Sequence, residues 1–379
     1  MYKMKSIKEI GNIKGKKVLV RVDFNVPIKD GKVLDDFRIK KALPTIEYLV
    51  KKGAIVILIT HLGDDGTQSL APVAVALKKY VKNVRFIKSP VLLGETEKEL
   101  DILKAGDVVL LENIRREVGE KKNDVSFARG LSRLGNFYVN DAFSVSHREH
   151  ASVVGLPKFL PGFAGFQMEE EVKNLSLAFH PNHPFLFILG GAKFETKIPL
   201  IKKFLKDADN VFIAGALAND FFKSRGYEVG ISLVDATNLN LKNLIRSSNL
   251  SLPTDVEVTN GKTKRVTKPI DVHKDENMVD VGPQTIAYLK EQITKAKFIL
   301  WNGPLGKYET GFGGATEEIL KFISKSKAKN IIGGGDTVAL VSKLKLESKL
   351  GFVSTGGGAT LDFLAKGTLP GIKALNNQK

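Results

Sequence analysis

The sequence of 379 residues contains no cysteine and no long apolar run. Without cysteine the chain has no disulfides, no thiolate catalysis and no cysteine-ligated zinc. None of the apolar runs approaches the roughly 20 residues that a membrane-spanning helix needs. The first residues also lack the apolar core of a signal peptide. We therefore expect a cytoplasmic protein that does not contact a membrane.

Several well-known phosphate-binding motifs are also missing. The sequence has no GxxxxGK[ST], no GxGxxG, and neither the HRD nor the DFG motif of protein kinases. These absences exclude P-loop enzymes, protein kinases and typical dinucleotide dehydrogenases.

Positive charge is in excess, with 58 lysines and arginines against 41 aspartates and glutamates, a formal net charge of +17. Solvated lysines on helix faces explain part of this excess, and a positive field also attracts anionic substrates. A nucleic-acid-binding protein should interleave basic residues with exposed aromatics or carry a known reading module. The sequence has neither feature, so we expect small anionic substrates and no nucleic-acid partner.

The chain is too long for one hydrophobic core, so two domains are expected. Continuous Val, Ile and Leu runs that alternate with helical patterns are typical of parallel sheets covered on both faces. These runs form two sets: 17–24, 54–60, 108–111 and 137–139, then 185–189, 211–214, 298–301, 330–332 and 351–353. An amphipathic stretch, 165–179, separates the sets and ends at prolines. The sequence predicts an α/β protein with two doubly wound parallel-sheet (Rossmann-like) lobes.

The two sets differ in the segments after their strands, where open parallel sheets bind ligands. Polar segments come after the first set, at 21–25, 60–63, 112–115 and 140–150, whereas glycine-rich turns come after the second set, at 190–193, 302–304, 333–337 and 356–358. Arginine clamps oxyanions in a bidentate manner. Glycine turns at helix starts offer backbone N–H groups to phosphates. One lobe is therefore expected to hold a small anion with side chains, and the other a polyphosphate with backbone.

Fifteen short segments along nearly the whole chain resemble those of phosphoglycerate kinases, in the same order. They include RVDFNVP (21–27), DDFRIKKALPTI (35–46), THLG (60–63), LGGAK (189–193), WNGPLGKYE (301–309), IIGGGDT (331–337) and STGGGAT (354–360). The resemblance implies reversible phosphoryl transfer from 1,3-bisphosphoglycerate to ADP, giving 3-phosphoglycerate and ATP, with Mg²⁺. It also implies a monomer that transfers the group directly, in line, after its lobes close around a hinge helix.

The resemblance also implies domain boundaries and site residues. The first lobe should cover 1–163, the hinge helix 164–182, the nucleotide lobe 183–358, and a segment packing back on the first lobe 359–379. The glycerate side should consist of Asp23, Asn25, Arg38, His61, Arg115 and Arg148. The nucleotide side should consist of Lys193, Lys197, Asn302, Glu309, Gly334, Gly335, Asp336 and Thr337, with Asp336 at the metal. The catalytic groups should be Arg38, Lys193, Gly357 and Gly358.

The sequence departs from the family pattern at two charged positions in the first lobe. Asp64 stands where the family usually has arginine, and Arg116 stands where an aromatic is common. A carboxylate at position 64 should repel the substrate. We hypothesise that Arg116 supplies the missing charge, either to the substrate or by neutralising Asp64; the alternative is that Arg116 points into solvent. Departures at 194–196 and 214–219 leave the choice between ATP and GTP open.

A second hypothesis is a catalytically weak paralogue that acts as a binding or regulatory protein. The retained Arg38, Lys193, Lys197 and Asp336 argue against loss of the site.

Overall fold

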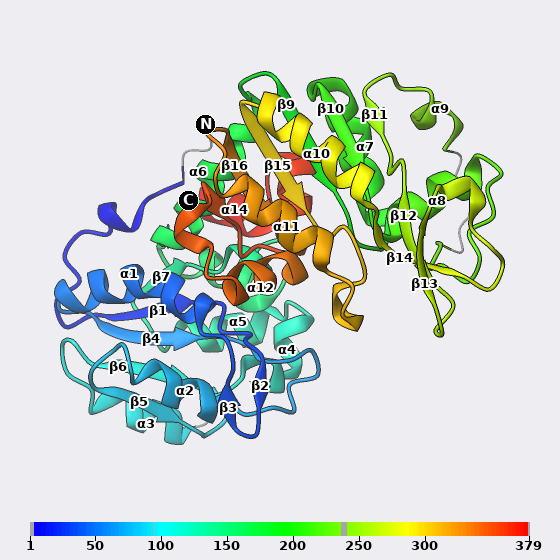
Figure 1. Ribbon diagram of the computed structural model, residues 1–379. Coiled ribbons are helices and arrows are strands. Elements are labelled where there is room, and N and C mark those ends of the chain that lie inside the picture. Colours follow the sequence, from blue (N-terminus) through cyan, green and yellow to red (C-terminus); the bar gives the residue numbers. More distant parts are fainter. Residues whose placement is uncertain (1–3, 93, 236–240, 378–379) are drawn as a thin grey trace. The chain divides into compact units, whose positions relative to one another are not determined.

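The structure, a computed structural model, describes residues 4–92, 94–235 and 241–377, without the side chains of Lys242 and Glu309. The chain divides into two compact units, the first formed by residues 1–173 with 366–379 and the second by residues 174–365. Each unit contains a parallel sheet flanked by helices (Figure 1). The domain boundaries expected from the resemblance differ in detail from this division and stay predictions.

The described residues of the first unit form a six-stranded parallel sheet in the order β5-β6-β4-β1-β7-β8. Its strands are β1 (Lys17–Arg21), β4 (Ile55–Ile59), β5 (Val84–Ile87), β6 (Val108–Leu111), β7 (Phe137–Asn140) and β8 (Gly162–Ala164). A short hairpin pairs β2 (Ile28–Lys29) with β3 (Lys32–Val33). The inner strands β4 and β6 consist of Val, Ile and Leu and are buried along their whole length, as helices on both faces require.

Helices and short turns cover this sheet. They are η1 (Ile7–Glu9), α1 (Phe37–Lys51), α2 (Ala71–Leu77), α3 (Gly94–Asp101), η2 (Ile114–Arg116), α4 (Val118–Lys121), α5 (Val125–Ser132), η3 (Phe143–Val145), η4 (Ala151–Gly155), η5 (Leu156–Lys158) and α14 (Pro370–Asn376). The C-terminal helix α14 packs against η4, and the Gly371 N–H donates to the carbonyl of Ser146 at 2.8 Å. The last residues of the chain therefore complete the first unit.

The described residues of the second unit form a six-stranded parallel sheet in the order β11-β10-β9-β15-β16-β17 and a three-stranded antiparallel sheet in the order β13-β12-β14. The parallel strands are β9 (Phe185–Leu189), β10 (Asn210–Ile213), β11 (Leu250–Ser251), β15 (Phe298–Asn302), β16 (Lys329–Gly333) and β17 (Phe352–Val353). The antiparallel strands are β12 (Val256–Thr259), β13 (Lys264–Thr267) and β14 (Asn277–Val281). Every residue of β9 and β15 is buried, which makes them the centre of this core.

The helices and turns of the second unit alternate with its strands. They are η6 (Leu177–Phe179), α7 (Phe194–Asp207), α8 (Ala216–Ser224), α9 (Lys242–Ile245), η7 (Pro269–Asp271), α10 (Pro283–Lys295), η8 (Tyr308–Thr310), α11 (Gly314–Ile323), α12 (Gly335–Lys343), η9 (Glu347–Lys349) and α13 (Gly358–Lys366). The boundary between the units falls within α6 (Phe166–Ser176), which occupies most of the helix predicted over 165–179.

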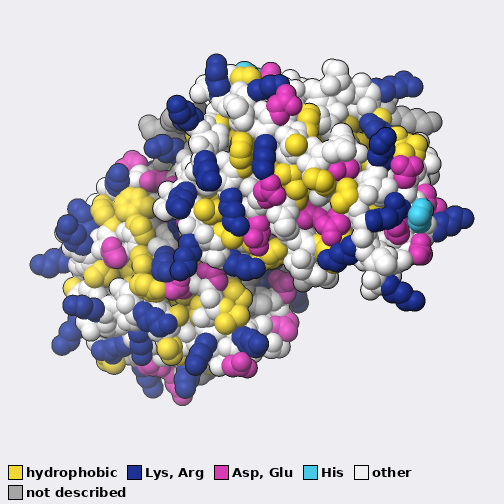
Figure 2. Space-filling model, in the orientation of Figure 1, with side chains coloured by type: hydrophobic (Ala, Val, Ile, Leu, Met, Phe, Trp, Pro, Cys, Tyr) yellow, Lys and Arg dark blue, Asp and Glu magenta, His cyan; other side chains and the backbone are white. Residues whose placement is uncertain are grey.

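The predicted fold class, two doubly wound α/β lobes, is confirmed. Lysine and arginine side chains are spread over the visible face among acidic ones (Figure 2), as expected for solvated lysines. None of the helices in the described ranges is long and apolar enough to cross a membrane.

Candidate active site

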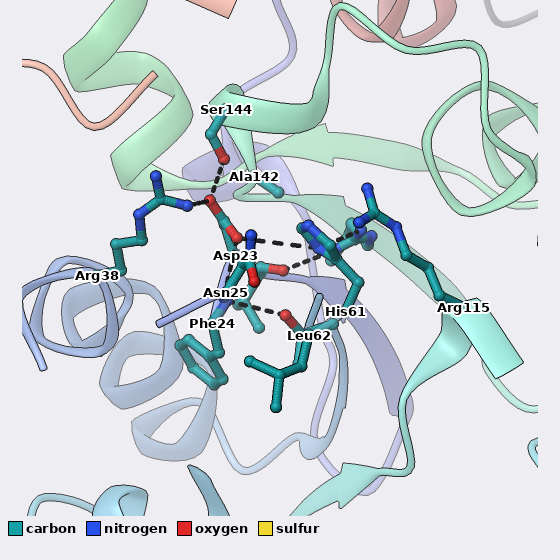
Figure 3. A network of polar contacts seen from close by, with 12 residues as sticks. Asp23, Phe24, Asn25, Arg38, His61, Leu62, Arg115, Ala142 and Ser144 are labelled. Carbon is teal, nitrogen blue, oxygen red and sulfur yellow. Dashed lines mark hydrogen bonds and ion pairs between the residues drawn. The ribbon is translucent and has the colours of Figure 1, made fainter. Parts of the chain in front are cut away.

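Polar side chains of the first unit gather where its parallel strands end. Asp23 and Asn25 follow β1, His61 follows β4, and Ser144 lies in η3 after β7 (Figure 3). Arg38 reaches them from the first turn of α1. Carboxyl ends of parallel strands meet at one edge of a sheet, so segments distant in sequence come together there. The structure therefore brings four predicted glycerate residues into one cluster.

Asp23 is the centre of this cluster. Its carboxylate accepts hydrogen bonds from the Arg38 guanidinium, from the Ser144 hydroxyl and, at 3.1 Å, from the backbone N–H of Asn25. Burial by itself would raise the pKa of Asp23, but the positive charge of Arg38 and the hydrogen bonds outweigh it and lower the pKa to about 2. Asp23 is therefore ionised and orients Arg38. The Arg38 side chain is still 31% exposed, so a ligand can reach it.

His61 is nearly fully buried and electrically neutral. Burial lowers its pKa well below the ordinary value, and the charges of nearby arginines add to this effect. Its Nδ1 lies 3.2 Å from Nη2 of Arg21, and because arginine can only donate, Nδ1 is the acceptor. The ring proton is therefore on Nε2, from which it can be donated to an anion.

Arg21 holds His61 in this state, a role that the sequence did not reveal. The Arg21 side chain is fully buried at the end of β1, and its Nε donates to the Ser152 hydroxyl at 2.9 Å. That hydroxyl donates in turn to Glu120 at 2.6 Å, and burial raises the pKa of Glu120. A buried chain of contacts thus runs from Glu120 through Ser152 and Arg21 to His61. The only signal in the sequence is the position of Arg21 two residues before Asp23.

Arg115 and Arg148, the other two predicted glycerate residues, both contact Asp64. The Arg115 side chain is 1% exposed, and its Nη1 donates to the Gly63 carbonyl and, at 2.7 Å, to Asp64 Oδ1. The Nη1 of Arg148 lies 3.8 Å from the same oxygen. Nε and Nη2 of Arg115 have no hydrogen-bond partner among the residues that the structure describes.

The hypothesis that Arg116 neutralises Asp64 is wrong. The Arg116 side chain is 41% exposed, in line with the alternative that it points into solvent, although it also contacts protein groups. Arg116 pairs with Glu112 at 3.2 Å and donates to the carbonyls of Gly66 and Thr67, each at 3.3 Å. Successive side chains of a 3₁₀ turn point about 120° apart. Within η2, Arg115 therefore faces the end of the sheet while Arg116 reaches the neighbouring loop.

Backbone turns form the corresponding edge of the second unit. Gly303, which follows β15, has a φ of +87°, and a Cβ there would lie 2.5 Å from the Gly190 carbonyl oxygen. A Cβ at Gly190, which follows β9, would lie 2.1 Å from the carbonyl oxygen of Pro304. Only glycine fits such contacts. The glycine pattern of the sequence thus reflects turns that pack backbone to backbone at the strand ends.

Two lysines mark the start of α7. Lys193, at the N-cap, is exposed and has a φ of +64°, in the left-handed region that other residues than glycine seldom adopt. Lys197 is buried, and its Nζ donates to the Gly190 carbonyl at 2.7 Å. Burial lowers the pKa of Lys197 to about 8; Asp336 opposes this shift and Lys193 adds to it. Both lysines and Asp336 therefore lie within electrostatic reach of one another.

Among the described residues, two of the predicted nucleotide residues at the ends of β15 and β16 have a buried polar group without a hydrogen-bond partner. Nδ2 of Asn302 and the hydroxyl of Thr337 lack a hydrogen-bond partner within the described ranges. Gly334 is the N-cap of α12, and Gly335 and Asp336 begin its first turn. The first N–H groups of a helix have no partner within it, so they favour anions.

The structure gives no side-chain contacts for three further predicted residues, Gly357, Gly358 and Glu309. Gly357 has a φ of +53° and Gly358 is the first residue of α13, so the turn can present backbone N–H groups. Glu309 belongs to η8, but its side chain lies outside the described part of the structure.

A cavity of about 330 Å³ opens beside these turns, within the second unit. Its lining is largely apolar, and it includes Gly191, Ala192, Asn219, Phe222, Leu233, Met278, Asp280, Pro304, Tyr308 and Asp336. Such a lining suits an aromatic heterocycle, with polar groups at the edge. Sequence reasoning missed Phe222, Leu233 and Met278, because nothing distinguishes them from core residues.

Asp280 was also missed, and its role is structural. Its carboxylate accepts from the backbone N–H of Ala315 at 3.1 Å and of Val281 at 2.9 Å. Burial raises the pKa of Asp280 to about 6. These contacts hold the start of α11 against β14 at the border of the cavity.

The residues beside the cavity fit the expected Mg²⁺. This ion is usually held by one or two carboxylates together with substrate phosphates. Asp336 offers such a carboxylate, and the unpartnered Thr337 hydroxyl is suited to a phosphate oxygen. Across the described residues, no group of three or more His, Asp or Glu side chains could hold a metal by itself.

Comparisons with known proteins agree with this geometry. The family model described as phosphoglycerate kinase matches residues 7–367. The chain is 43% identical to the phosphoglycerate kinase of Pseudothermotoga lettingae, over 99% of both chains, and 44% identical to that of Thermosipho africanus, over 97% of both. It resembles the solved structure of the Coxiella burnetii enzyme with a TM-score of 0.84 at 34% identity, over 100% of both chains. It resembles that of Pyrococcus horikoshii with a TM-score of 0.87 at 30% identity, over 98% of both.

Proposed function

The chain belongs to the phosphoglycerate kinase family, and we propose that its two units divide the substrates of that glycolytic reaction between them. The protein is a phosphotransferase that interconverts 1,3-bisphosphoglycerate and ADP with 3-phosphoglycerate and ATP. The observation that carries the proposal is the division of groups: buried arginines and a neutral histidine in one unit, glycine turns and lysines in the other.

The phosphorylated glycerate binds to the first unit. Arg38 stays exposed while Asp23 orients it, and Arg115 presents the Nη1 that Asp64 contacts, so both guanidiniums can bind an oxyanion. His61 donates from Nε2, and Asn25 holds the turn beside it, because its Oδ1 accepts from the Gly63 N–H at 3.0 Å. Arg148 lies at the rim and adds charge.

The nucleotide binds to the second unit. The apolar cavity receives the base, and the lysines at the start of α7 meet the phosphates together with the first turn of α12. Asn302 and Thr337 gain the hydrogen-bond partners that they lack. Mg²⁺, held by Asp336 and the phosphates, would neutralise negative charge when bound.

The chemistry needs positioning more than it needs a nucleophile. An acyl phosphate is already activated, so transfer depends on in-line alignment and on neutralising three equatorial oxygens. Arg38, Lys193 and the N–H groups at Gly357 and Gly358 supply charge and dipoles of the right sign. Because the substrates bind to different units, the units must approach each other before transfer. The approach also excludes water, which would hydrolyse the acyl phosphate. We further propose that the protein works as a cytoplasmic monomer.

A coupled assay with 3-phosphoglycerate, ATP and Mg²⁺ tests this assignment. Turnover should require all three components and should stop when EDTA removes the metal.

The KM for ATP should rise about 10-fold from about pH 7 to about pH 10, because a lysine that loses its proton no longer binds phosphate strongly. This loss should begin near pH 8, since the pKa of Lys197 is about 8.

The matched variant is Lys197→Arg, because arginine stays protonated over this range. Its KM for ATP should change little with pH, even if its value near neutrality differs. If the KM for ATP depended on pH in the same way in the wild type and in Lys197→Arg, the proposed role of Lys197 would be contradicted. Lack of turnover by the wild-type protein at every pH would contradict the proposed function.

A further inference from the structure

The Asp64 carboxylate contacts two of the arginines that the proposed function assigns to substrate binding. Its Oδ1 is 2.7 Å from Nη1 of Arg115 and 3.8 Å from Nη1 of Arg148. The Asp64 side chain is 87% exposed, whereas that of Arg115 is 1% exposed. The carboxylate therefore covers the accessible edge of an otherwise buried cation, in the way that a bound anion would.

The loop that carries Asp64 is fastened to the segment that carries Arg115. A Cβ at Gly66 would lie 2.3 Å from the Arg115 carbonyl oxygen, so the two backbones touch. Arg116 binds the carbonyls of Gly66 and Thr67, and the ammonium of Lys121 donates to the Asp64 carbonyl. These contacts involve backbone oxygens and do not neutralise the Asp64 carboxylate. The loop is thus held where the Asp64 carboxylate meets the two arginines.

The carboxylate at position 64 should affect the binding of anions according to their charge. An aspartate carries one negative charge, whereas a phosphate monoester carries nearly two at neutral pH. Both bind arginine through charge-assisted hydrogen bonds. A dianionic phosphate can therefore displace the carboxylate, at a cost in affinity, while a singly charged anion gains little from doing so.

We propose that Asp64 is an internal competitor for the anion site, a specificity-determining residue that weakens binding of the phosphorylated glycerate and discriminates against singly charged anions. The proposal rests on the proposed function for the identity of the substrate but not for the anion site itself. Arg116 holds the loop in the competing position and does not serve as a substrate ligand.

Isothermal calorimetry on the full-length wild-type protein, Asp64→Asn and Asp65→Asn tests the proposal, with 3-phosphoglycerate and separately with inorganic phosphate. Asp65 is the matched control, because it is the adjacent exposed carboxylate and its Oδ1 accepts from Thr67, at 3.0 Å from N and 2.9 Å from Oγ1. Asparagine can accept the same bonds. Asp64→Asn should bind both ligands about 3- to 30-fold more tightly, the effect being limited by the exposure of the carboxylate. Asp65→Asn should stay close to the wild type.

The possible results separate this inference from the proposed function. Weaker or equal binding by Asp64→Asn would overturn the inference, the former because it would mean that the carboxylate only holds the arginines in place. Equal tightening by both variants would also overturn it, since general charge would then be the cause. If Asp64→Asn tightens phosphate binding while no protein binds 3-phosphoglycerate, the inference stands and the proposed substrate is wrong.

Discussion

Replacing Arg38 by alanine should lower kcat about 100- to 1,000-fold while the KM for ATP changes little. In the proposed function the guanidinium neutralises charge that develops on the transferred group, and such donors are worth most in the transition state. Asp23 fixes the orientation of Arg38 and remains ionised, with its pKa lowered to about 2. Alanine removes the charge, and it leaves the Ser144 and Asn25 bonds to Asp23 in place. Steady-state kinetics with both substrates measure the effect.

Two further variants make the Arg38 result specific. Lys40→Ala removes a cation from the same helix that pairs with Asp36 at 2.8 Å and contacts none of the site residues; its kcat should match the wild type. Arg38→Lys keeps the charge but not the planar fork, so it should recover only part of the rate. A folded Arg38→Ala protein that turns over at the wild-type rate would refute the catalytic role.

Replacing Lys193 by asparagine or alanine should lower kcat about 100-fold, because in the proposed function its ammonium meets the transferred phosphoryl group from the nucleotide side. The side chain is exposed at the N-cap of α7, so its removal leaves no cavity. The choice of substitution must allow for the backbone, because Lys193 has a φ of +64°, in the left-handed region. Asparagine tolerates this conformation better than alanine does. Lys193→Asn therefore removes the charge without adding backbone strain.

Comparing Lys193→Asn with Lys193→Ala separates charge from strain. Both variants should lose the same large part of kcat. In urea unfolding the alanine variant should stay close to the wild type, because alanine meets the left-handed φ with the same Cβ as lysine, and the asparagine variant should be equally or more stable. Lys202→Ala, an exposed lysine on the same helix, should behave as the wild type in both measurements. Wild-type kcat in Lys193→Asn would show that the lysine is not catalytic.

The sequence predicted most of the parallel strands, but it missed the short edge strands β8 and β11. Continuous apolar runs located β1, β4, β6, β7, β9, β10, β15, β16 and β17; the bounds of β6 and β9 match, and those of the others differ by one to three residues at one or both ends. The edge strand β5 was missed because Arg85 is exposed and interrupts its run. The antiparallel strands β12 and β13 were missed because every second residue is more exposed, whereas β14 is mostly buried but Asp280 interrupts its apolar run. Such alternation is the mark of antiparallel sheets and needs a different search.

The site was predictable where its residues follow strands, and unpredictable where it depends on partners. In the structure Asp23, His61 and Arg115 follow β1, β4 and β6, although the predicted run 17–24 had included Asp23. The pairing of Asp64 with Arg115 depends on how the loop closes over η2, to which a contact between the Gly66 and Arg115 backbones contributes. Charge counting therefore suggested the wrong partner, Arg116. Cavity residues such as Phe222 carry no chemical signal at all.

The most direct test of the account is small-angle scattering with each substrate alone and with both. The side chains assigned to 3-phosphoglycerate belong to one unit, and the lysines and glycine turns assigned to the nucleotide belong to the other. We predict that 3-phosphoglycerate plus a non-hydrolysable ATP analogue with Mg²⁺ lowers the radius of gyration below the value with either ligand alone. An unchanged radius, with calorimetry showing that both ligands are bound, would contradict transfer between substrates held on separate units.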